Sequence, residues 1–143
     1  MSLKQLTIFV QNEQGALVSI TETLAKLNVN IRALSIADTE DFGILRLIVN
    51  DTETGYNTLK EEGYLIKITD VVGVKIGDEA GKLSEALKVL DDNKINMEYL
   101  YAFMLRTEKH AYMVLRVADN AAAEKALEDA GFHLVTDADV CKL

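Results

Sequence analysis

Apolar and polar residues alternate over residues 4–10, which places Leu6, Ile8 and Val10 on one face of a predicted strand. Polar residues and a glycine interrupt this pattern after Val10. Apolar residues then recur at spacings of three and four, namely Leu17, Ile20, Leu24 and Leu27. This spacing gives one apolar stripe and therefore predicts an amphipathic helix, for which Asn12 is a suitable N-cap.

Two strands joined by a hairpin are predicted over residues 31–38 and 43–49, where β-branched and other apolar residues are concentrated. A shorter helix is predicted over 54–62. It ends at Gly63, since glycine readily adopts the left-handed conformation that follows many helices. Residues 64–69 form a fourth strand. The first half of the chain therefore has the order strand–helix–strand–strand–helix–strand.

The second half of the chain repeats the first half in the same order. Residues 14–17 align with 80–83 at an offset of 66 positions, and 49–51 align with 117–119 at an offset of 68. The repeated elements are strands over 72–76, 97–105, 111–117 and 132–135 and helices over 83–90 and 121–130. A match that keeps its order along the whole chain indicates one architecture used twice.

This order of elements predicts an α+β fold made of two ferredoxin-like βαββαβ units, residues 1–70 and 71–143. Each unit has a four-stranded antiparallel sheet with both helices on one face, which leaves the other face and an edge strand uncovered. Units of about seventy residues are near the lower limit for a self-sufficient core. The chain has no proline and no Gly/Ser-rich linker. The units are therefore expected to pack as an intramolecular pair, through either sheet edges or sheet faces.

Composition narrows the class of protein. Forty-nine per cent of the residues are apolar, which suffices for a folded core. The formal net charge is −8 without a cluster of Lys and Arg, so nucleic acid and anionic membrane surfaces are not expected as partners. No segment approaches the roughly 20 apolar residues of a membrane span, and no signal sequence is recognisable. A single cysteine, Cys141, suits a reducing compartment, so a cytoplasmic protein is expected.

Two short motifs occur once in each half. The first lies between the first strand and the first helix, at Asn12-Glu13-Gln14-Gly15-Ala16-Leu17 and Asp78-Glu79-Ala80-Gly81-Lys82-Leu83. The second lies between that helix and the next strand, at Asn28-Val29-Asn30-Ile31 and Lys94-Ile95-Asn96-Met97. They resemble the D-x-P-G-x-L turn and the g-v-N-I signature of the ACT domain family, in the right order and over the whole chain. The family's proline is replaced by Gln14 and Ala80, and its aspartate by Asn12 in the first unit.

The resemblance implies a small-molecule sensor, usually for an amino acid, with its ligand bound where two ACT units meet. The chemistry of the turns agrees, because a glycine at the start of a helix lets a ligand approach the backbone, and free first-turn amides bind a carboxylate. Asparagine side chains at the start of the second strand offer donors and acceptors to a zwitterion. The candidate ligand-binding residues are Asn12, Gln14, Gly15, Ala16, Leu17, Asn30, Ile31, Asp78, Ala80, Gly81, Lys82, Leu83, Asn96 and Met97. The alternative is that the glycines and asparagines serve only as turn residues.

The two turns differ in charge. The first begins with neutral Asn12, whereas the second begins with Asp78 followed by Glu79. Two carboxylates beside a helix N-terminus compete with a ligand carboxylate for the same positive end of the helix. An anionic group is therefore expected to prefer the Gly15 turn, while Asp78 holds an ammonium group or caps its own helix.

Large side chains alternate along the second strand of the second unit, at Met97, Tyr99, Tyr101 and Phe103. The equivalent positions of the first unit are Ile31, Ala33, Ser35 and Ala37. Large residues opposite small ones interdigitate, so this stripe either forms ordinary core or shapes a pocket or an interface between the units.

Other candidates for chemistry are weaker. His110 and His133 have no cysteine or carboxylate partner at metal-ligand spacing, so neither a metal nor another cofactor is expected. Cys141 has no second cysteine beside it and is expected to be buried. Arg46 is expected on a sheet face or in a salt bridge. Because no nucleophile is paired with a general base, an enzyme is not expected.

The sequence therefore favours a stand-alone, non-catalytic regulatory protein that binds a free amino acid or a similar small zwitterion between its two units. Such a protein would report ligand level by changing how it docks to an enzyme of amino-acid metabolism or to a second copy of itself. The alternative is an accessory protein-interaction subunit that binds no ligand and docks through its sheet edge or uncovered face.

Overall fold

The computed structural model describes residues 3–11, 13–38, 42–104 and 109–142. Its first unit contains β1 (Leu3–Gln11), α1 (Ala16–Lys26), β2 (Ile31–Asp38), β3 (Phe42–Val49), α2 (Thr52–Glu61) and the long strand β4 (Leu65–Gly77). Its second unit adds α3 (Lys82–Asp92), β5 (Met97–Ala102), β6 (His110–Val117), α4 (Asn120–Asp129), β7 (His133–Val135) and α5 (Asp137–Lys142). The predicted order of strands and helices is confirmed in both halves.

Two helices begin earlier than predicted because an aspartate caps each of them. The Asp51 carboxylate accepts a hydrogen bond from the N–H of Thr54 at 3.2 Å, and α2 begins directly after Asp51. Asp119 does the same for Ala122 at 3.1 Å, and α4 follows it. Each cap satisfies one of the backbone donors that a helix leaves free at its first turn.

The two units share strand β4. Its first part pairs with β1 up to the pair Leu3–Val71. From Val72 onward it pairs with β6, beginning at Leu115, and with β7. The sequence predicted two separate strands here, but residues 69–71 contain no residue that breaks a strand, and the backbone runs straight through. Strand β4 therefore changes its partners after Val71.

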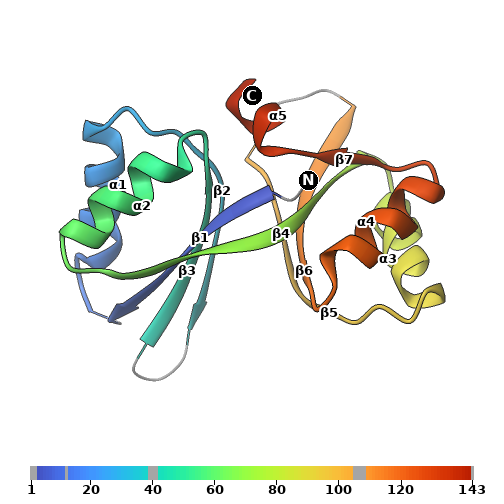
Figure 1. Cartoon of the computed structure of the whole chain (residues 1–143), viewed down its shortest axis with the longest axis horizontal. Coiled ribbons are helices and arrows are strands. Elements are labelled where there is room, and N and C mark those ends of the chain that lie inside the picture. Colours follow the sequence, from blue (N-terminus) through green and yellow to red (C-terminus); the bar gives the residue numbers. More distant parts are fainter. Residues whose placement is uncertain (1–2, 12, 39–41, 105–108, 143) are drawn as a thin grey trace.

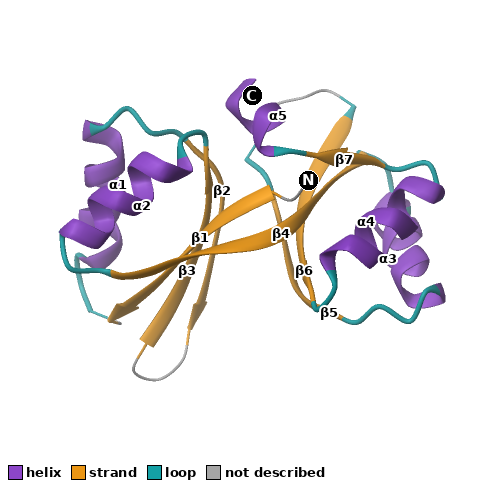
Figure 2. Cartoon of the chain, in the orientation of Figure 1, coloured by secondary structure: helices purple, strands orange, loops and turns teal. Residues whose placement is uncertain are grey.

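The sheet is antiparallel throughout, with the strand order β2-β3-β1-β4-β6-β5 and with β7 attached to β4. It curls until its two outer strands meet (Figure 1). The contact is an isolated bridge between Ala33 and Phe103, together with a hydrogen bond of 2.7 Å from the N–H of Met104 to the carbonyl of Arg32. Helices α1 and α2 cover the outer face of one half of the sheet, and α3 and α4 cover that of the other half (Figure 2).

Three apolar cores follow from this arrangement. One lies under α1 and α2, and its equivalent lies under α3 and α4. The third core joins the two inner sheet faces and consists of Leu3, Ala33, Ile48, Val71, Tyr101, Phe103, Val114, Val135 and Val140. The sequence left open whether the units join by edges or faces. The third core shows that they pack face to face, with an additional contact between the edges of β2 and β5.

The C-terminal helix α5 ties the second unit to the first. Its Asp137 carboxylate accepts a hydrogen bond from the backbone N–H of Lys4 at 2.9 Å, and Val140 is buried in the third core. The Cys141 thiol donates to the carbonyl of Asn50 at 3.2 Å. Cys141 is exposed, so the prediction of a buried cysteine is wrong. Within the part of the chain that is described, no helix combines the length and apolar character needed to cross a membrane.

Candidate functional site

Gly15 and Gly81 occupy the N-cap positions of α1 and α3, with left-handed backbone at φ 91° and 90°. Only glycine adopts this conformation without strain, which is why both turns require it. A Cβ added at either glycine would meet no atom within 4 Å, so the space beside both turns is open. No side chain among the described residues caps α1 or α3. Both turns therefore present open backbone at a helix N-terminus.

One backbone amide of each turn is already occupied. The N–H of Ala16 donates to the carbonyl of Glu13 at 3.4 Å, and that of Lys82 donates to Glu79 at 3.2 Å. These two amides are not free for a ligand, contrary to expectation. The predicted role of Asp78 as a helix cap is also wrong. Asn12, the proposed cap and ligand contact of the first turn, lies outside the described residues.

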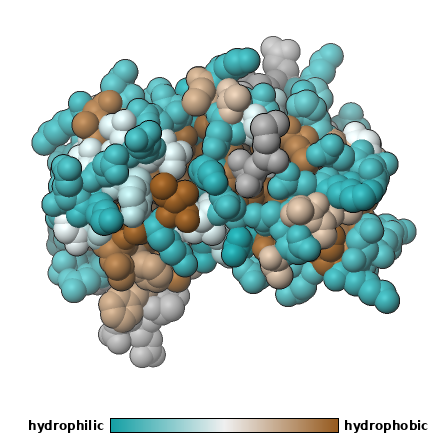
Figure 3. Space-filling model, viewed as in Figure 1, coloured by the Kyte–Doolittle hydropathy of each residue, from teal (hydrophilic) through white to brown (hydrophobic). Residues whose placement is uncertain are grey.

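The first turn opens into a pocket of about 580 Å³, called here the first-unit pocket. Its walls come from the end of β1, the start of α1, the start of β3 and the loop before β4, and include Phe9, Glu13, Gln14, Gly15, Ala16, Ser19, Phe42, Tyr64 and Leu65. The Tyr64 hydroxyl donates to Oγ of Ser19 at 2.8 Å, which joins the two sides of the pocket. Phe42 and Leu65 are 55% and 69% exposed and form an apolar rim. Hydrophobic side chains also gather over the ends of β1 and β3 at the lower left of Figure 3.

The predicted residues of the first unit do not all meet in this pocket. Gln14, Gly15 and Ala16 line it, whereas Leu17 does not. Asn30 lies beyond the opposite end of α1, where its backbone N–H donates to the Asn50 side chain at 2.9 Å. The aromatic and apolar part of the pocket was missed by sequence reasoning, because it comes from three segments that are distant along the chain.

The second unit has a pocket of about 500 Å³ in the equivalent place, called here the second-unit pocket. The repeat offsets that align the two halves also align the walls of the two pockets. The chemistry differs, because the second-unit pocket is lined by Lys75, Gly77, Lys82, Glu85, His110, Phe132 and His133, among others. Of the predicted second-turn residues only Lys82 is part of it, whereas Asp78, Ala80, Gly81 and Leu83 are not. His110 and His133, which are far apart in sequence, line the same hollow.

A β-bulge explains why two predicted ligand contacts belong to the core. The register shifts between Ile31 and Ala33 in β2 and between Met97 and Tyr99 in β5. A bulge moves one residue to the other face of the sheet. Ile31 therefore packs against the core under α1, and Met97 against the core under α3. Asn96, which is the equivalent of Asn30 in the second unit, is exposed.

The rest of the aromatic stripe lies between the units, as one of the two interpretations predicted. Tyr101 and Phe103 belong to the third core, and Phe103 faces the small residue Ala33. The guanidinium of Arg46 lies over the ring of Tyr99, 3.8 Å from its centroid. Arg46 thus has the predicted position on a sheet face, where it makes a cation–aromatic contact.

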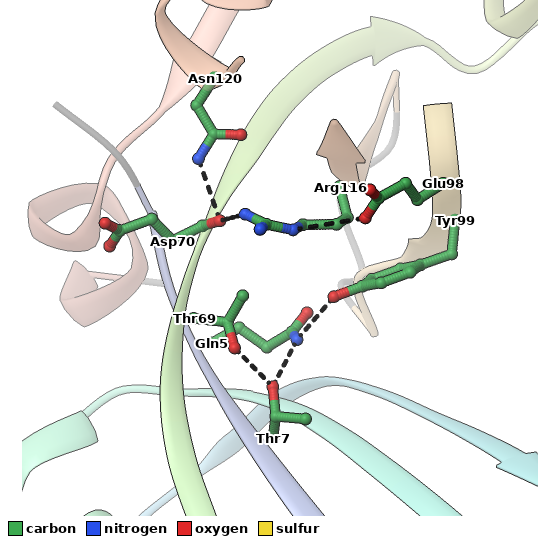
Figure 4. Close-up of polar contacts among 8 residues, drawn as sticks. All are labelled: Gln5, Thr7, Thr69, Asp70, Glu98, Tyr99, Arg116 and Asn120. Carbon is green, nitrogen blue, oxygen red and sulfur yellow. Dashed lines mark hydrogen bonds and ion pairs between the residues drawn. The ribbon is translucent and has the colours of Figure 1, made fainter. Parts of the chain in front are cut away.

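A buried glutamine connects the sheets at this point (Figure 4). Gln5 is fully buried, and its Nε2 donates to Oγ1 of Thr7 at 2.9 Å and to the hydroxyl of Tyr99 at 3.0 Å. The hydroxyl of Tyr101 donates to Oε1 of Gln5 at 2.6 Å. Burial raises the pKa of Tyr101 well above its usual range, and the charge of Tyr99 raises it further, while Arg46 lowers it. The hydroxyl therefore stays protonated and remains a donor.

A second polar contact stabilises the point where β4 changes partners. The carbonyl of Asp70 accepts from Nη1 of Arg116 at 2.7 Å and from Nδ2 of Asn120 at 3.0 Å (Figure 4). Arg116 in turn lies 3.6 Å from the Glu98 carboxylate, and the Asp70 carboxylate pairs with Lys4. Side chains of β6 and α4 thus satisfy a carbonyl near the junction between the two halves of the sheet. Among the described residues, no group of His, Cys and carboxylate side chains is arranged to hold a metal ion.

Comparison with known proteins agrees with this geometry. The family model described as ACT domain pair matches residues 1–143, and the chain therefore belongs to this family. The crystal structure of protein BT0572 from Bacteroides thetaiotaomicron is 37% identical, has a TM-score of 0.93, and covers 100% of this chain and 98% of its own. None of the curated proteins matches the sequence significantly.

More distant structures share the fold. The ligand-free regulatory subunit of aspartate kinase from Thermus thermophilus is 12% identical with a TM-score of 0.66, covering 91% of this chain and 93% of that subunit. A crystal structure of aspartokinase α and β subunits is 18% identical with a TM-score of 0.57, covering 88% of this chain and 91% of its own. At these identities the likeness concerns the fold alone.

Proposed function

We propose that this protein is a non-catalytic regulatory sensor, located in the cytoplasm, that binds a free amino acid or a similar small zwitterion. The observation that carries the proposal is the first-unit pocket, which combines an open glycine turn with an apolar wall. Membership of the ACT domain pair family and a fold shared with a regulatory subunit of aspartate kinase support a regulatory role. The volume of about 580 Å³ is within the usual range for small-molecule sites.

The pocket offers a place for each part of an amino acid. The open N-terminus of α1 beside Gly15 suits the carboxylate, because first-turn amides and the helix dipole favour a negative group. Glu13 lines the same pocket and suits the ammonium group. Phe9 and Phe42 provide an apolar wall for the side chain. An amino acid with an apolar or aromatic side chain fits this arrangement best.

The pocket is lined by residues of the first unit alone. The resemblance implied a ligand between the two units of one chain, but side chains of the third core fill that space. We propose instead that a second copy of the chain covers the exposed rim at Phe42 and Leu65. The ligand would then lie where ACT units of separate chains meet. A change in this dimer would transmit the ligand level to an enzyme of amino-acid metabolism.

The same rim supports a second candidate function. Exposed apolar side chains as large as Phe42 and Leu65 are typical of a surface that docks another protein. An accessory subunit without a ligand would use this surface directly. The two functions differ in whether a free amino acid stabilises the protein.

Thermal unfolding in the presence of each of the twenty amino acids tests the proposal. A ligand at 100 times its dissociation constant stabilises the folded state by about 2.7 kcal/mol. For a chain of this size, that corresponds to a rise in Tm of roughly 5–10 °C. If no amino acid raises Tm while the protein still captures a partner through its rim, the accessory function is favoured.

Two matched variants locate the site. Gly15→Val places a branched residue in a left-handed conformation at the first turn, and Gly81→Val does the same at the second turn with nearly the same φ. We expect calorimetry to show loss of amino-acid binding in Gly15→Val, with affinity retained in Gly81→Val. Unchanged affinity in folded Gly15→Val would exclude the first turn as the contact.

A further inference from the structure

The second unit contains a second hollow directly beside its pocket. The two hollows share Lys75 and His133, and the smaller one, of about 200 Å³, reaches α5. Together they form what is called here the cationic cleft, whose basic and hydroxyl side chains are Lys75, Lys82, His110, Tyr112, His133 and Lys142. Three lysines and two histidines thus gather in one place on a chain whose formal net charge is −8.

Lys75 is the centre of this cleft. On β4 it pairs with Tyr112 of β6 on one side and with His133 of β7 on the other, so all three side chains lie on the same sheet face. Lys75 is half-buried, and it has no hydrogen bond or ion pair with any described residue. A partly desolvated ammonium group without a partner is unfavourable. An anionic ligand in the cleft would supply the missing partner.

One carboxylate of α5, that of Asp139, lines the cleft and is already engaged. Asp139 accepts from the N–H of Thr136 at 2.9 Å and from its Oγ1 at 3.1 Å, which caps the short helix. The backbone hydrogen bond from Thr136 holds the pKa of Asp139 below its usual range, and the charges of His133 and Lys142 contribute in the same direction. Glu85 lines the other end of the cleft and lies 3.5 Å from Lys82 in an exposed ion pair. Such a pair is weak, so Lys82 remains available to a ligand.

Gly77, at the end of β4, leaves room for the side chain of Lys82. A Cβ added at Gly77 would meet Cγ of Lys82 at 3.1 Å, which shows that the lysine side chain lies across this glycine. The equivalent positions in the first unit carry Gln11 and Ala16. The second unit therefore has the small residue on the strand and the long residue on the helix. This exchange brings a positive charge into the hollow.

Other positions around the two pockets are also apolar in the first unit and polar or basic in the second unit. Phe9, Phe42, Ile44 and Leu65 of the first unit correspond to Lys75, His110, Tyr112 and His133 of the second. Four apolar positions have become polar or basic at one site, while the fold around them is unchanged. The sequence predicted that an anionic group prefers the Gly15 turn, because of Asp78 and Glu79. Neither of these acidic residues lines the cleft.

From these contacts we propose that the cationic cleft binds a small dianion, carried either by a phosphate group or by a dicarboxylate. Lys75 binds one charged oxygen from the sheet face. Lys82 and Lys142 approach from α3 and α5, and the imidazole of His133 adds a further donor. This site goes beyond the proposed amino-acid function, because it lies in the other unit and takes a different chemical class of ligand. The protein would then respond to two ligands.

Calorimetric titration at low ionic strength tests the proposal with inorganic phosphate and succinate as probes and with glycerol as an uncharged control. We expect saturable binding of phosphate or succinate and none of glycerol. A stronger response to phosphate identifies a phosphoryl ligand, and a stronger response to succinate a dicarboxylate. Binding should weaken markedly at high salt, because the contacts are charged and partly exposed. Absence of saturable binding for both dianions would overturn the proposal.

Variants of the lysines give the matched control. Lys75→Gln should weaken dianion binding at least tenfold, whereas Lys88→Gln, which removes an exposed lysine on α3 outside the cleft, should leave it unchanged. The double variant Gly77→Gln with Lys82→Ala restores the residue pair of the first unit and should also weaken binding. Equal binding by Lys75→Gln and Lys88→Gln would refute the assignment. Amino-acid binding at the Gly15 turn should persist in Lys75→Gln, which separates this test from that of the proposed function.

Discussion

The loss of unfolding free energy on removal of the Tyr101 hydroxyl should show how strongly the buried Gln5 joins the two halves of the sheet. Tyr101→Phe deletes the donor that lies 2.6 Å from Oε1 of Gln5 and leaves the ring in place. Gln5 is fully buried, so water does not reach the acceptor that loses its partner. A buried polar group left unpaired costs about 1–3 kcal/mol. We expect the free energy of unfolding to fall by about 2 kcal/mol with the fold unchanged.

Urea unfolding of single and double variants is the assay. Replacing both partners, in Gln5→Leu with Tyr101→Phe, removes the acceptor together with its donor, so the two effects should not add. The expected interaction energy is about 1–2 kcal/mol. Tyr56→Phe is a matched control, because the Tyr56 hydroxyl has no hydrogen bond with any residue that the structure describes, and it should change stability by less than about 0.5 kcal/mol. Equal effects of Tyr101→Phe and Tyr56→Phe, or strict additivity in the cycle, would refute the reasoning.

The same hydroxyl predicts a pH dependence. Burial raises the pKa of Tyr101 in the folded state above the value of 10.0 that an exposed tyrosine has. The folded state therefore holds this proton more tightly than the unfolded state does. The associated stability is fully present below about pH 10 and is lost as the pH rises further. The wild-type protein should lose stability above about pH 10 more steeply than Tyr101→Phe does; parallel curves would contradict this.

Three further predictions concern the backbone and the join between the units. Lys94 has φ 57°, so Lys94→Gly should raise the free energy of unfolding by about 0.5–1 kcal/mol, and Asn28→Gly should raise it less because asparagine tolerates this conformation. Val140→Ala should destabilise by about 2 kcal/mol in urea, since Val140 is buried in the third core; a neutral result would mean that α5 is not docked. Residues 1–71 expressed alone should melt at a lower temperature and less cooperatively than the full chain, because their inner sheet face is uncovered.

The order of elements could be predicted because the chain alternates clearly and does so twice. Leu6, Ile8 and Val10 point into the core under α1 and α2, as the alternation indicates. The glycines of both turns, Gly15 and Gly81, were found by their spacing, and their left-handed backbone explains the motif. Local pattern was sufficient for these features, because each depends on neighbours in the sequence.

Features that depend on distant segments could not be predicted in the same way. The β-bulges place Ile31 and Met97 on the helix-covered face of the sheet. They cannot be recognised from the alternation of apolar and polar residues in β2 or β5. Helix α5 is too short to show a stripe, and Cys141 is exposed because its position is set by the contact of α5 with Asn50. The walls of both pockets come from segments separated by tens of residues. The repeat aligns Tyr64 with Phe132, and these residues line the two pockets at equivalent places. This alignment was the signal for the pocket walls that the sequence offered.

The most direct test of the central claim is a measurement of backbone amide chemical shifts by 1H–15N NMR. The titrant is the amino acid that raises Tm most. We expect the largest changes at the first turn, at Gln14 and Gly15, which line the first-unit pocket, and little change at the amide of Gly81. Largest changes at the Gly81 turn, or saturable binding without changes at either turn, would contradict the assignment of the amino-acid site to the first unit.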